Sequence, residues 1–96
     1  MLTAKQRQFL KGLAHPLSPV VRVGKGGVSD AVVEETKKSL EAHELIKVRI
    51  EVEDSKERRA TAERLATATG SHVAAVIGKT AVLFRARAEK SKIRLP

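Results

Sequence analysis

Four consecutive residues, Gly24, Lys25, Gly26 and Gly27, have the types and the order that could hold a phosphate group. Glycine leaves the backbone N–H groups open to close approach by an anion, and the lysine adds a positive charge. The four residues follow a β-branched run and precede a helix start, where free N–H groups and the helix dipole favour negative charge. The alternative is a tight turn that only needs a positive φ angle. Because no acidic residue lies within residues 1–29, we favour the phosphate-binding interpretation.

Residues that could support catalysis or bind a metal form no comparable pattern. His43 and Glu44 could act as an acid–base pair, but the histidine is expected at a helix end and the glutamate at a strand start, so the two side chains should diverge. The three histidines lack a metal-ligand spacing, and the chain has no cysteine. We therefore expect no enzyme activity, cofactor, metal or small-molecule substrate. The alternative is an enzyme whose site is completed by a second chain or by RNA.

The basic residues are concentrated towards both ends of the chain. Lysine and arginine number 19 against 11 acidic residues, which gives a net charge of +8. The middle of the chain, residues 30–63, is mildly acidic. A basic surface gains affinity for a polyanion by releasing counterions, so we expect a nucleic acid as partner, with an ordinary basic surface as the alternative. Besides Lys25, the expected contacts are Lys5, Arg7, Lys11, Arg22, Lys79, Arg85 and Arg87.

Length and hydropathy indicate one domain with no membrane association. No apolar run approaches the roughly 18–20 residues of a membrane span, and residues 1–17 lack the apolar centre and cleavage site of a signal peptide. The absence of cysteine is typical of a reducing compartment. We therefore expect a soluble, monomeric, cytoplasmic protein whose single domain covers residues 1–96, with residues 88–96 as a basic C-terminal tail.

Helical and strand patterns alternate along the chain. Apolar residues recur at helical spacing over residues 3–15, 29–43 and 55–69. Strands are expected at residues 20–23 and 44–53, followed by a hairpin around Gly78 and Lys79. The resulting α-β-α-β-α-β-β order predicts an α/β two-layer sandwich with a mixed four-stranded sheet. Its first two strands should be parallel and its last two antiparallel.

The hairpin register assigns side chains to the two faces of the sheet. With Gly78 and Lys79 as the turn, Val73 should oppose Phe84, and both should lie on a packed face. We therefore expect Phe84 in the core and not stacked on a base.

Four basic side chains are expected on the exposed face of the sheet. Lys47 and Arg49 occupy the polar positions of the second strand, and Arg85 and Arg87 continue the same alternation in the last strand. A solvated sheet face is the alternative interpretation, most of all for Lys47.

Four segments together resemble the CRM domain, an RNA-binding module of chloroplast splicing factors and of small YhbY-like bacterial ribosome-assembly proteins. They are LAHPLSPVVRVGKGG (13–27), HELIKV (43–48), VIGKTAVLFR (76–85) and KIRLP (92–96). The resemblance implies a fold similar to the C-terminal domain of translation initiation factor 3 and binding of structured RNA. It also implies that residues 24–27 contact RNA, like the GxxG loop of KH domains. Phe84 departs from the tyrosine common in the family.

These observations predict an RNA-binding protein that associates with ribosomal RNA or large-subunit precursors during ribosome assembly. Because the chain has two phenylalanines and neither tyrosine nor tryptophan, recognition should depend on phosphates, sugars and shape and not on base stacking. The alternative is a protein–protein adaptor whose basic faces dock an acidic ribosomal partner.

Overall fold

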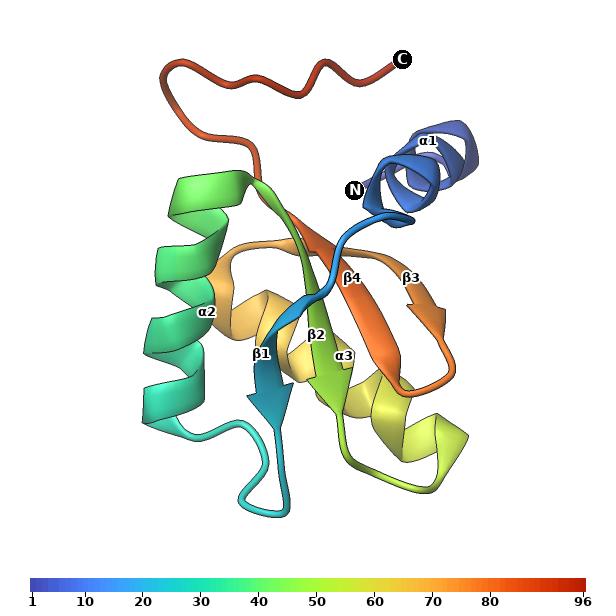
Figure 1. Ribbon diagram of the computed structural model, residues 1–96, viewed down its shortest axis with the longest axis vertical. Coiled ribbons are helices and arrows are strands. Elements are labelled where there is room, and N and C mark those ends of the chain that lie inside the picture. The colour runs from blue at the N-terminus through green and yellow to red at the C-terminus, as the bar shows by residue number, and fades with distance from the viewer.

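Three helices and four strands follow one another in the order that the sequence predicts. The computed structural model describes all 96 residues. None of the helices is long and apolar enough to cross a membrane. The helices are α1 (Ala4–Ala14), α2 (Asp30–His43) and α3 (Ser55–Thr69), and the strands are β1 (Pro19–Val23), β2 (Leu45–Ile50), β3 (His72–Ile77) and β4 (Thr80–Phe84) (Figure 1).

The four strands form one mixed sheet in the order β1-β2-β4-β3. β1 is parallel to β2, and β4 is antiparallel to both β2 and β3, as predicted for the two strand pairs. Because β1, β2 and β3 run in the same direction, their C-terminal ends meet at one end of the sheet. We call this the loop end; it carries residues 24–27, 51–54 and 78–79. The opposite end, called the tail end, carries residues 15–18, Glu44 and residues 85–96.

Each helix begins directly after an N-cap residue. The side chains of Thr3, Ser29 and Asp54 accept hydrogen bonds from the first turns of α1, α2 and α3, which satisfies N–H groups that have no partner within the helix. α3 stops at Gly70, whose φ of 69° lies in the left-handed region that favours glycine. Sequence-local chemistry therefore sets the boundaries of the helices that cover the sheet.

Apolar side chains pack on both faces of the sheet. α2 and α3 cover one face and enclose the larger core, so sheet and helices form the two predicted layers. α1 packs on the other face at the tail end, where Leu10 and Ala14 enclose a smaller core with Leu45 and Phe84. Phe84 is a core residue, as expected. The tail adds Ile93 and Leu95 to the edge of this second core.

The predicted hairpin register is wrong beyond its first pairs. Val73 pairs with Leu83 and His72 with Phe84, because the register shifts between Val73 and Ala75. One extra residue in an antiparallel strand turns the following side chains to the opposite face. Val73 consequently packs against the core under α2 and α3, whereas Phe84 lies in the core under α1.

Candidate nucleic-acid interface

The loop of residues 24–27 joins β1 to α2 at the loop end of the sheet (Figure 1). The N–H of Gly27 donates to the carbonyl of Gly24 at 3.0 Å, which closes a four-residue turn with Lys25 and Gly26 in its central positions. The N–H of Ser29 then donates to the carbonyl of Gly27 at 3.0 Å. These two bonds fix the loop directly before α2 begins.

Only one of the three glycines is required by the backbone. Gly27 has a φ of 69°, a conformation that other residues adopt at a cost. Gly24 and Gly26 do not have a positive φ, and a Cβ at either position would meet no atom within 4 Å. The tight turn that the sequence left as an alternative therefore explains Gly27 and leaves Gly24 and Gly26 unexplained.

Several donors of the loop have no partner within the chain. The backbone N–H groups of Lys25, Gly26 and Val28 donate to no acceptor of the chain. The side chain of Lys25 is exposed and forms no ion pair. Bare N–H groups beside a free ammonium are the groups that bind phosphate oxygens in proteins.

Two arginines lie next to the loop, on the sheet face opposite α2 and α3. The parallel pairing of β1 with β2 places Arg22 beside Arg49, and both approach the carboxylate of Glu51. The distance from Nε to the Glu51 Oε1 is 2.6 Å for Arg49 and 3.8 Å for Arg22, whose side chain is 73% exposed. The hydrogen bond from Arg49 is the main reason that the pKa of Glu51 is lowered. Arg22 thus keeps most of its surface available.

Lys79 reaches the loop end from the β3–β4 turn. Its Nζ lies 2.7 Å from Oε1 of Glu53, and this hydrogen bond lowers the pKa of the Glu53 carboxyl. Glu53 is exposed, and ion pairs at an exposed surface contribute little to stability. Lys79 can therefore exchange this carboxylate for a phosphate at low cost.

The expected contacts on α1 lie elsewhere. Lys5 and Lys11 are exposed on a helix that covers the tail end, and Arg7 donates to the carbonyl of Leu2 at 2.9 Å (Figure 1). The structure thus places Arg22, Lys25 and Lys79 at the loop end and separates them from the α1 residues.

The expected positions of Arg85 and Arg87 on an exposed strand face are wrong. β4 ends at Phe84, so both arginines follow the strand. Arg85 donates to the carbonyl of Thr69 at 2.9 Å and to Glu41 at 3.3 Å, and Arg87 lies 3.9 Å from the carboxylate of Glu44. The acidic partners lie more than forty residues earlier in the chain, so the local sequence gave no sign of them.

Glu44 is the principal residue that the sequence interpretation missed. Its side chain is 1% exposed, and its φ of 63° is rare for a residue other than glycine. The carboxylate accepts hydrogen bonds from the N–H of Arg87 at 2.9 Å, the hydroxyl of Ser91 at 2.6 Å and the N–H of Lys92 at 2.6 Å. The sequence signal was a glutamate at the end of a helix, where a glycine is common.

Opposing effects set the pKa of Glu44. Burial raises it, but the hydrogen bonds from Ser91, Lys92 and Arg87, together with the charge of Arg87, lower it from 4.5 to about 2. The carboxylate is therefore ionised and fully engaged in holding the tail. None of its hydrogen bonds involves His43.

Comparisons with known proteins agree with the fold. The family model of the CRS1/YhbY (CRM) domain matches residues 2–85. The Bacillus subtilis protein named probable RNA-binding protein YqeI is 41% identical over 96 residues, with all of both chains covered. A Haemophilus influenzae protein named RNA-binding protein is 40% identical, over 99% of this chain and 95% of its own. The solution structure of SAV1595 from Staphylococcus aureus has a TM-score of 0.90 and 38% identity, with both chains covered completely.

Proposed function

The chain belongs to the CRS1/YhbY (CRM) domain family, and from this premise we propose that it binds structured RNA through the loop of residues 24–27. The observation that carries the proposal is the set of free N–H groups at Lys25, Gly26 and Val28, beside two glycines that the turn does not need. The net charge of +8 and the names of the two bacterial relatives support the same partner.

A phosphate in the loop would accept hydrogen bonds from these N–H groups and form an ion pair with Lys25. Arg22 and Lys79 lie at the same end of the sheet as the loop and would contact further phosphates of the RNA. Such contacts fix the position of the RNA and carry no base sequence. Phe84 is buried, which leaves Phe9, 39% exposed, as the one phenylalanine at the surface. A single ring does not make a platform for stacking successive bases, so the protein would recognise the shape of a folded RNA.

The α1 residues form a second, separate contact in this proposal. Lys5 and Lys11 are exposed and would reach a different segment of the RNA from the tail end. Arg7 and Arg85 donate to groups of the chain itself, and Arg87 forms an ion pair with Glu44, so their share in RNA binding is expected to be smaller.

We further propose that the RNA is ribosomal and belongs to precursors of the large subunit. The support is the resemblance of four segments to the bacterial single-domain members of the family. This chain also covers 100% of the Bacillus relative and 95% of the Haemophilus relative, both of which are named as RNA-binding proteins. The protein would act as an RNA-binding factor and not as an enzyme.

The test compares two substitutions that add the same negative charge. Gly26→Asp places a carboxylate where the phosphate would lie, and the open space at its Cβ should leave folding intact. Ala68→Asp adds a carboxylate to an exposed position of α3, away from the loop. Binding to protein-free large-subunit ribosomal RNA should fall at least tenfold for Gly26→Asp and by less than about twofold for Ala68→Asp. Equal affinities of the two variants, both melting like the wild type, would remove the loop from the interface.

A further inference from the structure

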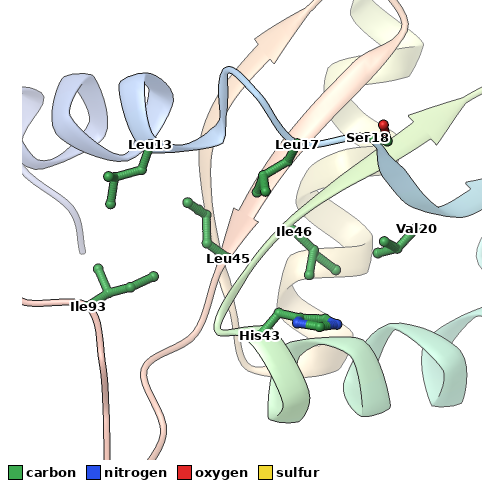
Figure 2. Close-up of a pocket in the computed structure, with 8 residues that line it drawn as sticks. All are labelled: Leu13, Leu17, Ser18, Val20, His43, Leu45, Ile46 and Ile93. Atoms are coloured by element: carbon green, nitrogen blue, oxygen red, sulfur yellow. The ribbon is translucent and has the colours of Figure 1, made fainter.

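A groove with a volume of about 510 Å³ opens at the tail end, away from the loop. It lies between residues 15–18, the end of α2, the start of β2 and the tail, and Figure 2 shows side chains from all four segments directed into it. Six of the eight lining residues are apolar, namely Leu13, Leu17, Val20, Leu45, Ile46 and Ile93. The remaining two, Ser18 and His43, supply few polar groups.

Several apolar side chains at the rim of this tail-end groove are exposed to solvent. Leu13 is 42% exposed, Leu17 39% and Val20 50%. Phe9, which is 39% exposed, lies one helical turn before Leu13 on the same side of α1. Scattered exposed apolar residues are ordinary, but a contiguous set that borders a groove is typical of an interaction site.

One wall of the groove is held in place by Glu44. The carboxylate binds the N–H groups and the hydroxyl of residues 87–92, which positions Ile93 over the groove. The Nε2 of Gln6 also donates to the carbonyl of Pro96 at 3.3 Å. The match to the CRM domain ends at residue 85, so this wall lies outside the matched segment.

The surroundings of the groove are basic. Lys92 and Arg94 flank Ile93 and are exposed, and Lys47 donates to the carbonyl of His15 at 3.1 Å next to the linker that carries Leu17. No acidic residue lies within residues 1–29, and the carboxylate of Glu44 is occupied by the tail. An occupant with negative charge around an apolar centre would complement both properties.

The lining favours protein side chains over nucleobases. A base carries several donors and acceptors on its edge, and burying them without partners costs free energy. Ser18 and His43 are too few to satisfy them, and the imidazole of His43 is the one lining ring that could stack on a base, with no arginine beside it. Aliphatic or aromatic side chains of a protein need no such partners.

We propose that the tail-end groove binds a protein segment that presents two or three apolar side chains flanked by aspartate or glutamate. The groove and the loop lie at opposite ends of the sheet, separated by the length of β1, or about 17 Å at the rise of an extended strand. A protein segment at one end therefore leaves room for RNA at the other. The protein would link an RNA to an acidic segment of a second protein.

The experiment selects peptides from a displayed library of random 12-residue sequences against the full-length chain. The enriched sequences should combine aliphatic or aromatic residues with aspartate or glutamate. One selected peptide is then synthesised and titrated against variants. Leu17→Asp should weaken its binding at least tenfold, because it places a carboxylate in the apolar rim. The matched control is Ile77→Asp, since Ile77 is 48% exposed on β3 outside the groove; this variant and Lys25→Ala should bind the peptide like the wild type.

Folding and the competing occupants are tested with the same proteins. Leu17→Asp should melt like the wild type and keep its RNA affinity; if it does not fold, Leu17→Ser takes its place. The proposal is overturned if no peptide is enriched, or if the selected peptide binds the Leu17 variant as well as the wild type. Two further results also overturn it. In one, an RNA oligonucleotide shifts the methyl resonances of Leu13 and Leu17. In the other, the wild type forms a dimer that the Leu17 substitution dissociates.

Discussion

At the loop end, Lys25 is exposed and the neighbouring backbone N–H groups have no partner in the chain. At the tail end, by contrast, Arg85 donates to oxygens of Thr69 and Glu41, and the guanidinium of Arg87 lies 3.9 Å from the carboxylate of Glu44. Both ends are basic in sequence, but Lys25 and the N–H groups beside it have no partner, whereas the two arginines that follow β4 are held by groups of the chain. A basic residue becomes a candidate contact when the fold gives it no internal partner, and the sequence alone does not show this.

The largest expected effect concerns the carboxylate that organises the tail end. The pKa of Glu44 falls from 4.5 to about 2 on folding, which corresponds to roughly 3 kcal/mol. Because the folded state has the lower pKa, this stability is present above pH 4.5 and is lost as the pH falls towards 2. Glu44→Gln should lose most of it at neutral pH.

Chemical unfolding from pH 7 to pH 2 measures this loss. The wild type should show the pH dependence between pH 4.5 and 2, and Glu44→Gln should show much less of it. Glu41→Gln serves as control, since Glu41 is exposed and makes one contact of 3.3 Å to Arg85. Parallel curves for the wild type and Glu44→Gln would mean that Glu44 does not hold the tail.

The second comparison lies within the loop itself. Gly27→Ala forces a Cβ into the left-handed conformation and should lower the free energy of unfolding by about 1 kcal/mol. Gly26→Ala meets neither a positive φ nor a close atom and should leave stability unchanged. Thermal melting of the two variants distinguishes the glycine that the turn requires from the glycine that only leaves the backbone N–H groups accessible. Equal losses would show that the glycines serve the turn alone.

A third prediction sets one arginine of each end against the other. Arg85→Ala removes hydrogen bonds to Thr69 and Glu41 and should cost about 1 kcal/mol of stability, with RNA affinity within about twofold of the wild type. Arg22→Ala removes a largely exposed side chain, so RNA affinity should fall a few-fold while the melting temperature stays the same. The opposite pattern would place the RNA at the tail end.

Most of the fold follows from short-range chemistry that the sequence displays. The helical spacing of apolar residues and the alternation of β2 predict the elements, and the helix or hairpin between two strands predicts their directions. The irregularity near Ala74 was hidden, because alanine, valine and isoleucine pack equally well on either face. For the same reason, the sequence does not show which face of the sheet α1 covers.

Part of the candidate site could be predicted from the local sequence, and part could not. The position of residues 24–27 between β1 and α2 follows from the local pattern, and so does the exposure of Arg22. The role of Glu44 does not, since its partners Arg87, Ser91 and Lys92 come from the far end of the chain. Long-range hydrogen bonds decide which charged groups are occupied.

The salt dependence of RNA binding tests the phosphate contact at Lys25 most directly. The logarithm of the affinity of the wild type for ribosomal RNA should fall with the logarithm of salt concentration with a slope of about −3 to −5. Lys25→Ala should reduce the magnitude of this slope by about one unit without changing the melting temperature. Lys38→Ala, which removes an exposed lysine from α2, should keep the slope of the wild type. Slopes that are the same for the wild type and both variants would contradict the phosphate contact at the loop.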